Sequence, residues 1–209
     1  MTTSPTILIV PGLRDHVAEH WQTLLEQKLL GEHKKVRSVA PLEHDKLSRD
    51  ARVAALDRAL ADIDGPVILV AHSAGVMITV HWAQQHQRPI LGALLAAPAD
   101  LESPFPAGYP TADALRENGW LPIPRDPLPF PSIVAASTDD PLGRFERVCE
   151  FANAWGSRLE NIGAVGHLNP AAGFGEWPQA EVLIRELAGE REGLPQLSIA
   201  HHSGADSLP

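Results

Sequence analysis

The sequence predicts an α/β fold in which helices cover both faces of a mostly parallel sheet. Short β-branched runs alternate along the chain with longer segments of helical periodicity, which is the pattern of βαβ units. The strand-like runs are continuously apolar, as expected for strands that are buried on both faces. The chain has 209 residues, 44% of them hydrophobic, which suits one domain with a sizeable core.

The first part of the chain predicts a strand, a helix and a second strand. Residues 6–10 (TILIV) form an apolar run that Pro11 and Gly12 end. Residues 16–30 carry apolar side chains at helical spacing and therefore predict a helix. Residues 35–39 (KVRSV) predict a short strand.

The middle of the chain predicts a central strand between two helices. A helix is expected over 47–63, with Ser48 as its N-cap. Residues 67–71 (VILVA) predict a buried strand. The helix expected over 75–86 is apolar on most sides, which indicates a position inside the fold.

The remaining elements continue the same alternation. Apolar runs at 90–98 and 132–137 predict strands, and 158–163 predicts a weaker one. Helical periodicity predicts helices over 144–156 and 179–190.

Two segments interrupt the alternation. Residues 99–131 are rich in proline and show periodicity for only one short helix, at about 111–118. Irregular segments of this length are usually functional or mobile. Residues 191–209 lack sustained periodicity and are expected to form a disordered tail. The sequence therefore predicts one domain over about 5–188.

Composition narrows the classes of function. The formal net charge of −9 argues against binding to the phosphate backbone of nucleic acids. The N-terminus lacks the basic region of a signal peptide, and no apolar stretch approaches the length of a membrane span. Cys149 is the only cysteine, which excludes an internal disulfide. We expect a cytoplasmic protein with neither a nucleic-acid partner nor a membrane span, of undetermined oligomeric state.

The strand at 67–71 runs directly into a serine flanked by small residues. In a nucleophile elbow a serine occupies a sharp strand-to-helix turn, and small residues two before and two after it let the turn pass its neighbours. Ser73 has this position, with Gly75 after it and Ala71, in place of the usual glycine, before it. A purely structural turn is the alternative, but the strand before and the helix after favour a nucleophile.

A serine nucleophile needs a base to take its proton and an acid to orient that base. In folds with this elbow the partners follow in the order serine, acid, histidine. TDDP supplies Asp139 and Asp140 after a predicted strand, and GHLN supplies His167 after the next. An ordinary turn and a surface histidine are the alternatives for each motif alone. Their order after the elbow favours a Ser–Asp–His triad.

Two backbone N–H groups are expected to stabilise the oxyanion. One belongs to Ala74, the residue after the nucleophile. The other comes from the loop after the first strand, where Leu13 is the candidate and Gly12 permits a close backbone approach.

These motifs together resemble the small α/β-hydrolase-fold serine hydrolases of the retinoblastoma-binding protein 9 type, which include many bacterial members. The resemblance covers about residues 5–188 and rests on LIVPGL, EHWQ, VAHSAG, ASTDDPLGRFERV and GHLNPAAGFGEWP. It implies an α/β-hydrolase fold without a large lid domain, and it implies that alanine is accepted at position 71. It assigns the triad to Ser73, Asp140 and His167, with Asp139 as the weaker candidate.

The triad and the resemblance together lead us to expect esterase-like hydrolysis of an ester, thioester or amide through an acyl-enzyme. We expect a small-molecule acyl substrate and no metal or organic cofactor, while the resemblance indicates the mechanism and not the natural substrate. The loop LRDHVAEHW is bulkier and more charged than in other members, which concerns substrate access. Residues that are candidates for lining or supporting the site are His72, Asn169, Trp120, Phe174 and Trp177.

Two other functions are weighed against this one. His16, Glu19 and His20 fit the H-x-x-E-H pattern of a zinc peptidase, in which both histidines bind zinc and the glutamate is the base. That pattern is short and can arise by chance. We interpret His20 and Trp21 instead as residues that pack beside the oxyanion loop and support it. The second alternative is a non-catalytic binding protein with a hydrolase fold, which a missing triad residue would favour; all three are present.

Overall fold

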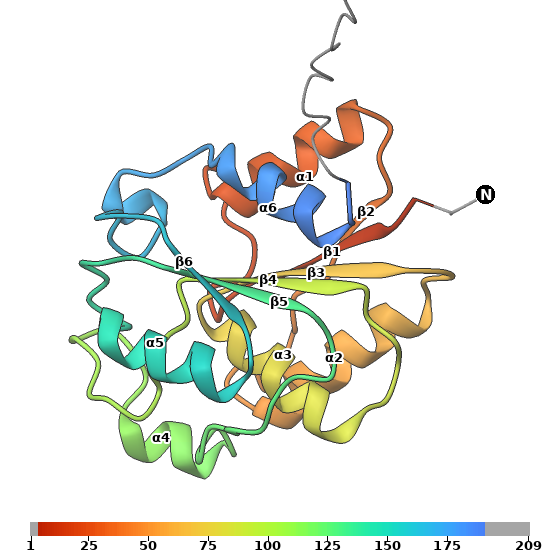
Figure 1. The fold of residues 1–209 in the computed structure, drawn as a ribbon. Helices are drawn as coiled ribbons and strands as arrows, with labels where there is room; N and C mark the ends of the chain where they lie inside the picture. The colour runs from red at the N-terminus through yellow and green to blue at the C-terminus, as the bar shows by residue number, and fades with distance from the viewer. Residues whose placement is uncertain (1–3, 191–209) are drawn as a thin grey trace, which may run out of the picture.

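A parallel sheet of six strands organises the computed structural model, which describes residues 4–190. The strands lie in the order β2-β1-β3-β4-β5-β6, and every neighbouring pair is parallel (Figure 1). The strands are β1 (Thr6–Val10), β2 (Val36–Ser38), β3 (Val67–His72), β4 (Gly92–Ala96), β5 (Ser132–Ala136) and β6 (Arg158–Asn161). This arrangement confirms the predicted α/β class. The predicted tail, 191–209, lies outside the described residues.

Helices cover both faces of the sheet, as Figure 1 shows. One face carries α1 (Trp21–Gly31) and α6 (Gln179–Leu187). The other carries α2 (Arg49–Ala61), α3 (Ala74–Gln85) and α5 (Phe145–Ala154), with the short α4 (Ala112–Glu117) at the outer edge of that layer. The topology is therefore doubly wound, and its switch point lies between β1 and β3.

The central strand β3 shows why two helical layers are needed. Its side chains alternate between two apolar clusters: Leu69 and Ala71 face the cluster with α2, α3 and α5, while Ile68 and Val70 face the cluster with α1 and α6. All four are fully buried. Because both sides of the strand are apolar, either face left uncovered would expose a row of aliphatic side chains to water.

The structure corrects one predicted boundary substantially. Helix α1 begins at Trp21, whereas the apolar spacing predicted a start at residue 16. Residues 17–20 form a turn, in which the His20 N–H donates to the Val17 carbonyl at 3.0 Å. The His20 imidazole then caps the helix, since its Nδ1 accepts from the Gln22 N–H at 3.2 Å. The other predicted elements agree within a turn of helix or two residues of strand, and Ser48 caps α2 as predicted.

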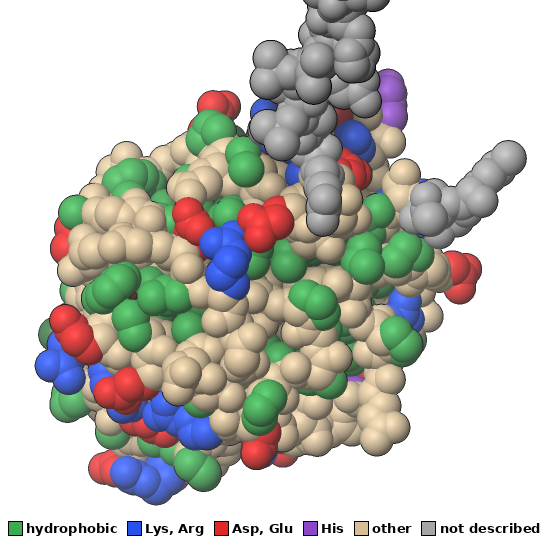
Figure 2. Space-filling view, in the orientation of Figure 1, with side chains coloured by type: hydrophobic (Ala, Val, Ile, Leu, Met, Phe, Trp, Pro, Cys, Tyr) green, Lys and Arg blue, Asp and Glu red, His purple; other side chains and the backbone are tan. Residues whose placement is uncertain are grey.

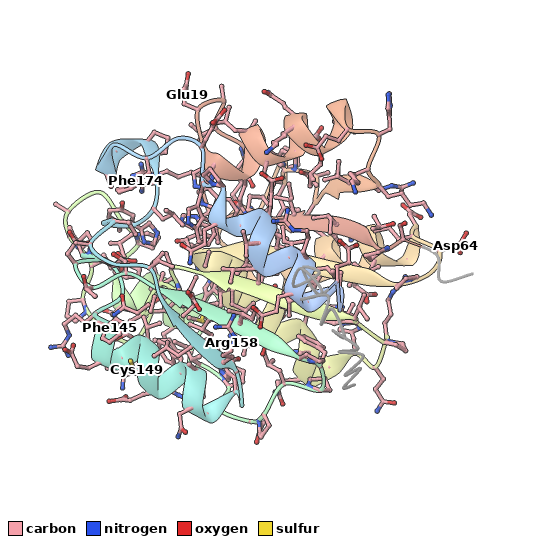
Figure 3. All side chains as sticks on the ribbon, turned by 45° about the horizontal axis from the view of Figure 1, so that its top comes forward. Glu19, Asp64, Phe145, Cys149, Arg158 and Phe174 are labelled. Carbon is pink, nitrogen blue, oxygen red and sulfur yellow. The ribbon has the colours of Figure 1, made fainter. Side chains whose placement is uncertain are left out.

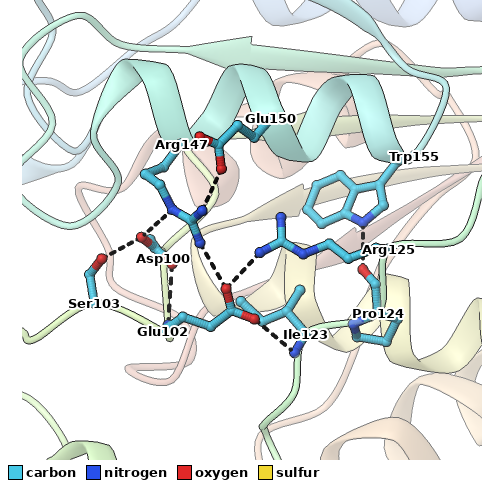
Figure 4. Close-up of polar contacts among 9 residues, drawn as sticks. All are labelled: Asp100, Glu102, Ser103, Ile123, Pro124, Arg125, Arg147, Glu150 and Trp155. Carbon is cyan, nitrogen blue, oxygen red and sulfur yellow. Dashed lines mark hydrogen bonds and ion pairs between the residues drawn. The ribbon is translucent and has the colours of Figure 1, made fainter.

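The proline-rich segment 99–131 is fastened to α5 by a network of charges (Figure 4). Arg147 donates from Nε to Asp100 Oδ2 at 3.1 Å and from Nη2 to Glu102 Oε2 at 2.7 Å. Arg125 reaches the same Glu102 oxygen at 2.6 Å. Trp155 adds a hydrogen bond from its indole N–H to the Pro124 carbonyl at 2.9 Å. Both ends of the segment are thus tied to one helix.

The surface carries interspersed charges on the face shown in Figure 2, where basic and acidic side chains lie next to one another. Arg158 on β6, labelled in Figure 3, pairs with Glu160 at 2.5 Å and Glu186 at 2.8 Å. Within residues 4–190, no helix has the length and apolarity that crossing a bilayer requires. Cys149 is half-buried on α5 (Figure 3).

Candidate active site

Ser73 occupies the turn between β3 and α3, at the carboxyl edge of the sheet. Its backbone has φ 57° and ψ −125°, a conformation that side chains other than glycine rarely adopt. The Ser73 N–H donates to the Ala96 carbonyl at 3.1 Å, which fixes the turn to the neighbouring strand. The crevice beside β1 at the switch point, where such folds bind ligands, lies directly next to this turn.

Two glycines make room for the turn. A Cβ on Gly75 would lie 2.2 Å from the Val10 carbonyl oxygen and 2.8 Å from that of Pro11, so α3 can pass the end of β1 only with glycine here. A Cβ on Gly12 would lie 3.3 Å from Ser73 Cβ and 3.6 Å from its Oγ. Gly12 therefore keeps space open beside the hydroxyl.

The three predicted triad residues lie in one chain of hydrogen bonds. His167 Nε2 is 2.8 Å from Ser73 Oγ, and His167 Nδ1 is 2.8 Å from Asp140 Oδ2. Both His167 and Asp140 are buried. Asp140 also accepts from the Leu142 N–H at 2.8 Å, which orients its carboxylate. The carboxylate can hold a proton on Nδ1, which leaves Nε2 free to accept the proton of the serine hydroxyl.

Asp139, the weaker candidate for the acid, supports the histidine loop. Its Oδ1 accepts from the Gly166 N–H at 2.7 Å and from the Ser137 hydroxyl at 2.9 Å. The Ser137 oxygen in turn accepts from the Val165 N–H at 3.2 Å. The two adjacent carboxylates thus contact the same loop differently, one at the backbone and one at the imidazole.

His72, the residue before the serine, contacts the backbone of the same loop. Its Nε2 is 2.9 Å from the His167 carbonyl oxygen, which can only accept, so Nε2 carries the proton. The His72 ring also lies 4.9 Å from the His167 ring and 4.6 Å from the His20 ring, centroid to centroid. His72, a predicted supporting residue, therefore fixes the backbone of His167.

Gln22 is a supporting residue to which the sequence assigned no role. Its buried side-chain amide donates to the Val70 carbonyl at 2.9 Å and to the Val10 carbonyl at 3.3 Å. It therefore bridges β3 and β1 where the crevice opens. The one indication of this role in the sequence is that Gln22 belongs to the EHWQ motif. A single glutamine does not by itself predict a structural or catalytic role.

The histidines beside the candidate triad have lowered pKa values. Burial, followed by the positive charge of His167 and of His16 when protonated, lowers the pKa of His20 to about 4. Burial and the same kind of repulsion, from His167 and His20, lower the pKa of His72 well below its ordinary value. Both rings are therefore neutral at pH 7.

Mild acid is expected to destabilise the fold through His20. Because its folded pKa lies below the unfolded value of 6.5, the unfolded state alone gains a proton as the pH falls from about 6.5 towards 4. His20 is expected to lower the free energy of unfolding by about 2 kcal/mol between pH 7.5 and pH 5. Urea unfolding at both pH values measures this change in free energy.

His20→Asn is the matched variant for that experiment. Asparagine keeps an acceptor for the N-cap of α1 but does not titrate. The stability loss between the two pH values should be smaller than in the wild type by about 2 kcal/mol. If His20→Asn loses as much unfolding free energy between the two pH values as the wild type does, the lowered pKa of His20 is not the cause of the loss.

Ser73 opens into a cavity of about 320 Å³. Leu13 and Ala74, the candidate oxyanion donors, both line it, and Ala74 is the first residue of α3, where N–H groups have no acceptor within the helix. Asn169 lines it too, and its side chain caps a short 3-10 helix at Pro170–Ala172 by accepting from the Ala172 N–H at 3.0 Å. Ala99, Leu101 and Phe105, from the 99–131 segment, line it as well.

The three aromatic candidates lie outside the lining of this cavity. Trp120 is fully buried beneath α2 and α3, where its indole N–H donates to the Leu47 carbonyl at 2.6 Å. Trp177 packs edge-on against Trp21, with the ring centroids 4.9 Å apart. Phe174 is half-buried in the loop after the 3-10 helix (Figure 3). All three side chains pack against other parts of the protein. The sequence shows that a residue is aromatic, but it does not show which cavity the ring faces.

The zinc pattern does not have the geometry that it requires. His16 and His20 would have to lie one helical turn apart, but residues 16–20 are not helical. His16 Nε2 is instead 3.2 Å from the Val39 carbonyl, and the Glu19 side chain is exposed and points away from the protein (Figure 3). Residues 4–190 contain no cluster of three metal-ligating side chains.

Comparison with known proteins finds similar chains. A family model described as serine hydrolase matches residues 7–186. A protein described as a YdeN-like hydrolase from Pectobacterium atrosepticum is 33% identical, with a TM-score of 0.75 over 89% of this chain and 91% of that one. No curated protein matches significantly.

Two more distant structures share the fold. The ydeN gene product of B. subtilis has 19% identity and a TM-score of 0.70, over 89% of this chain and 100% of that one. Mouse alpha/beta hydrolase domain-containing protein 10 has 14% identity and a TM-score of 0.65, over 90% and 92%. The fold is therefore that of the α/β hydrolases.

Proposed function

The chain belongs to the serine hydrolase family, and from this we propose that it hydrolyses ester bonds through an acyl-enzyme formed on Ser73. The observation that carries the proposal is the continuous hydrogen-bonded chain from Ser73 Oγ through His167 to Asp140. A nucleophile, its base and the acid that orients the base are the parts that acyl transfer requires. We place the chain, within the family, with the retinoblastoma-binding protein 9 type, and its hydrolase domain at residues 5–188.

In the first half of the reaction, Ser73 Oγ attacks the carbonyl carbon of the substrate. His167 Nε2 accepts the hydroxyl proton, and the Asp140 carboxylate stabilises the resulting imidazolium. The carbonyl oxygen becomes an oxyanion, which the backbone N–H groups of Ala74 and Leu13 stabilise. The oxyanion then re-forms the carbonyl as the bond from the acyl carbon to the leaving group breaks. His167 gives its proton to the leaving group, and the acyl group stays on Ser73.

In the second half, water takes the place of the leaving group. His167 Nε2 removes a proton from the water as the water oxygen attacks the acyl carbon. The bond to Ser73 Oγ breaks, Ser73 regains its proton from His167, and a carboxylic acid is released. Each step uses only groups that lie at the carboxyl edge of the sheet, and the chemistry is equally open to thioesters and amides.

A fluorophosphonate probe tests the proposal. The Ser73 oxygen displaces fluoride from phosphorus, so the wild type is expected to gain one probe per chain, with and without EDTA. Ser73→Ala should gain none. The matched control is Ser157→Ala, since Ser157 precedes β6 at the opposite end of the parallel sheet and should leave labelling unchanged.

The outcomes of this test are distinct. An unlabelled wild type would contradict a nucleophilic Ser73 and favour the non-catalytic alternative. Labelling of the Ser73→Ala variant would place the nucleophile elsewhere, and esterase activity lost to EDTA would require a metal. Esters of p-nitrophenol with different acyl lengths, beside aminopeptidase substrates, then separate esterase from amidase activity.

A further inference from the structure

The cavity at Ser73 has mostly apolar walls and few charged residues. The apolar walls include Leu13, Val17, Leu101, Phe105 and Leu142. The charged residues and histidines that line it are Arg14, Asp15, His20, His72 and His167. Which of these charges is uncompensated decides which substrates the cavity favours.

The Asp15 carboxylate is already neutralised. Arg52 donates from Nη1 to Asp15 Oδ1 at 2.5 Å, with side-chain exposures of only 5% and 13%. Arg52 is further held by the Leu13 carbonyl at 3.2 Å and the Lys46 carbonyl at 2.9 Å. A buried pair with several hydrogen bonds stays paired, so Asp15 presents little negative charge to the cavity.

Arg14 is the charge that remains. Among the ion pairs formed by residues 4–190, none involves Arg14. Its guanidinium carbon instead lies 5.2 Å from the centroid of the Tyr109 ring, which packs against Phe105 at 5.7 Å. A guanidinium held over a ring still has N–H donors for a carboxylate.

Arg14 is an exposed residue, and its neighbour Asp15 is held by the ion pair with Arg52. Arg14 lies directly between Leu13, the candidate oxyanion donor, and the immobilised Asp15. Its aromatic partner, Tyr109, comes from the 99–131 segment, in which Asp100 and Glu102 pair with Arg147 of α5. One positive charge therefore lies at the cavity, in a chain whose net charge is −9.

We propose that Arg14 selects substrates that carry a carboxylate, separated from the scissile carbonyl by a short apolar spacer. The inference rests on the proposed function and deepens it, because it names the substrate class of the same site. The apolar walls suit the spacer, and the unpaired guanidinium suits the carboxylate. The carboxylate can belong to the acyl group or to the leaving group, so both are tested.

Paired esters test the acyl side. The p-nitrophenyl monoester of glutaric acid and p-nitrophenyl valerate differ mainly in a carboxylate against a methyl group. Arg14→Met is expected to lower kcat/KM for the glutarate ester about tenfold, allowing for solvent screening, and to leave the valerate ester within about twofold. Arg14→Lys should restore part of the loss, and Arg116→Met, an exposed arginine on α4, should have no effect.

The leaving-group side is tested with 4-carboxyphenyl butyrate against phenyl butyrate. A tenfold loss in Arg14→Met for this pair, and not for the glutarate pair, would assign the carboxylate to the leaving group. Equal losses for the charged and neutral esters, or no loss for either charged ester, would overturn the inference.

Binding separates this inference from the proposed function. Monomethyl glutarate is titrated calorimetrically into Ser73→Ala and into the same variant with Arg14→Met. A dissociation constant about tenfold weaker in the second variant, and a loss of affinity with added salt, are expected. If this difference appears while the wild type hydrolyses no ester, the proposed function fails and carboxylate recognition stands; equal affinities would refute recognition itself.

Discussion

Replacing His167 with alanine is expected to lower kcat for an activated ester by about 10⁴-fold or more. Without the imidazole, no group accepts the Ser73 proton at 2.8 Å, and no group returns it to the leaving group. Because the triad acts as a unit, adding Ser73→Ala should lower the rate little further. Steady-state hydrolysis of a p-nitrophenyl ester measures kcat, with urea unfolding to verify that the variants are folded.

The adjacent carboxylates supply a matched control for this prediction. Asp140→Asn removes the charge that holds the His167 Nδ1 proton and should cost about 10⁴-fold in kcat. Asp139→Asn keeps an oxygen for the Gly166 N–H and the Ser137 hydroxyl, and it should cost less than about tenfold. Equal effects at the two positions would contradict the assignment of the acid to Asp140.

The sheet and the main site motifs could be predicted because local signals carry them. The four central strands, β1, β3, β4 and β5, are short apolar runs. Each partner of Ser73 follows a strand, and parallel topology brings the strand ends to one edge. The choice of Asp140 over Asp139 came from a family resemblance and not from the residues themselves. The hydrogen bonds show the physical difference: one carboxylate faces the imidazole and the other the backbone.

The remaining features depend on contacts that are distant in sequence. The start of α1 at Trp21 depends on a histidine cap, and histidine is not among the usual N-cap residues. The hydrogen bond from His72 to the His167 carbonyl spans 95 residues. Trp120 was a plausible cavity residue in a proline-rich segment, but its indole N–H pairs with the Leu47 carbonyl, 73 residues away. No local pattern records such pairings.

Contacts that are distant in sequence also hold the segment at 99–131. Its length and prolines predicted a functional or mobile segment, and its residues Phe105 and Tyr109 do line the cavity. Arg147 pairs with Asp100 and Glu102, which lie 47 and 45 residues away in the sequence, and these two pairs hold the segment against α5 (Figure 4). Composition alone does not reveal which acid meets which base.

Gly75→Ala is expected to destabilise the protein by about 3 kcal/mol and to lower its Tm by about 6–12 °C. The new Cβ would lie 2.2 Å from the Val10 oxygen, 2.8 Å from the Pro11 oxygen and 3.0 Å from the Val10 carbonyl carbon. All three are backbone atoms, so no side chain can move aside and β1 itself must shift. That shift would displace the loop carrying Leu13, and kcat should fall by about 10²-fold as well.

Ala71→Gly is the comparison that separates the two small residues of the elbow. Ala71 is fully buried in β3, opposite Val10 and Leu95 in the sheet register, and its methyl group packs in the core. Removing that methyl should cost only about 1 kcal/mol, through lost burial and the greater freedom of glycine in the unfolded chain. Urea unfolding of both variants gives the two free energies. If the two variants lose the same free energy of unfolding, the close approach of α3 to β1 is not what requires glycine at position 75.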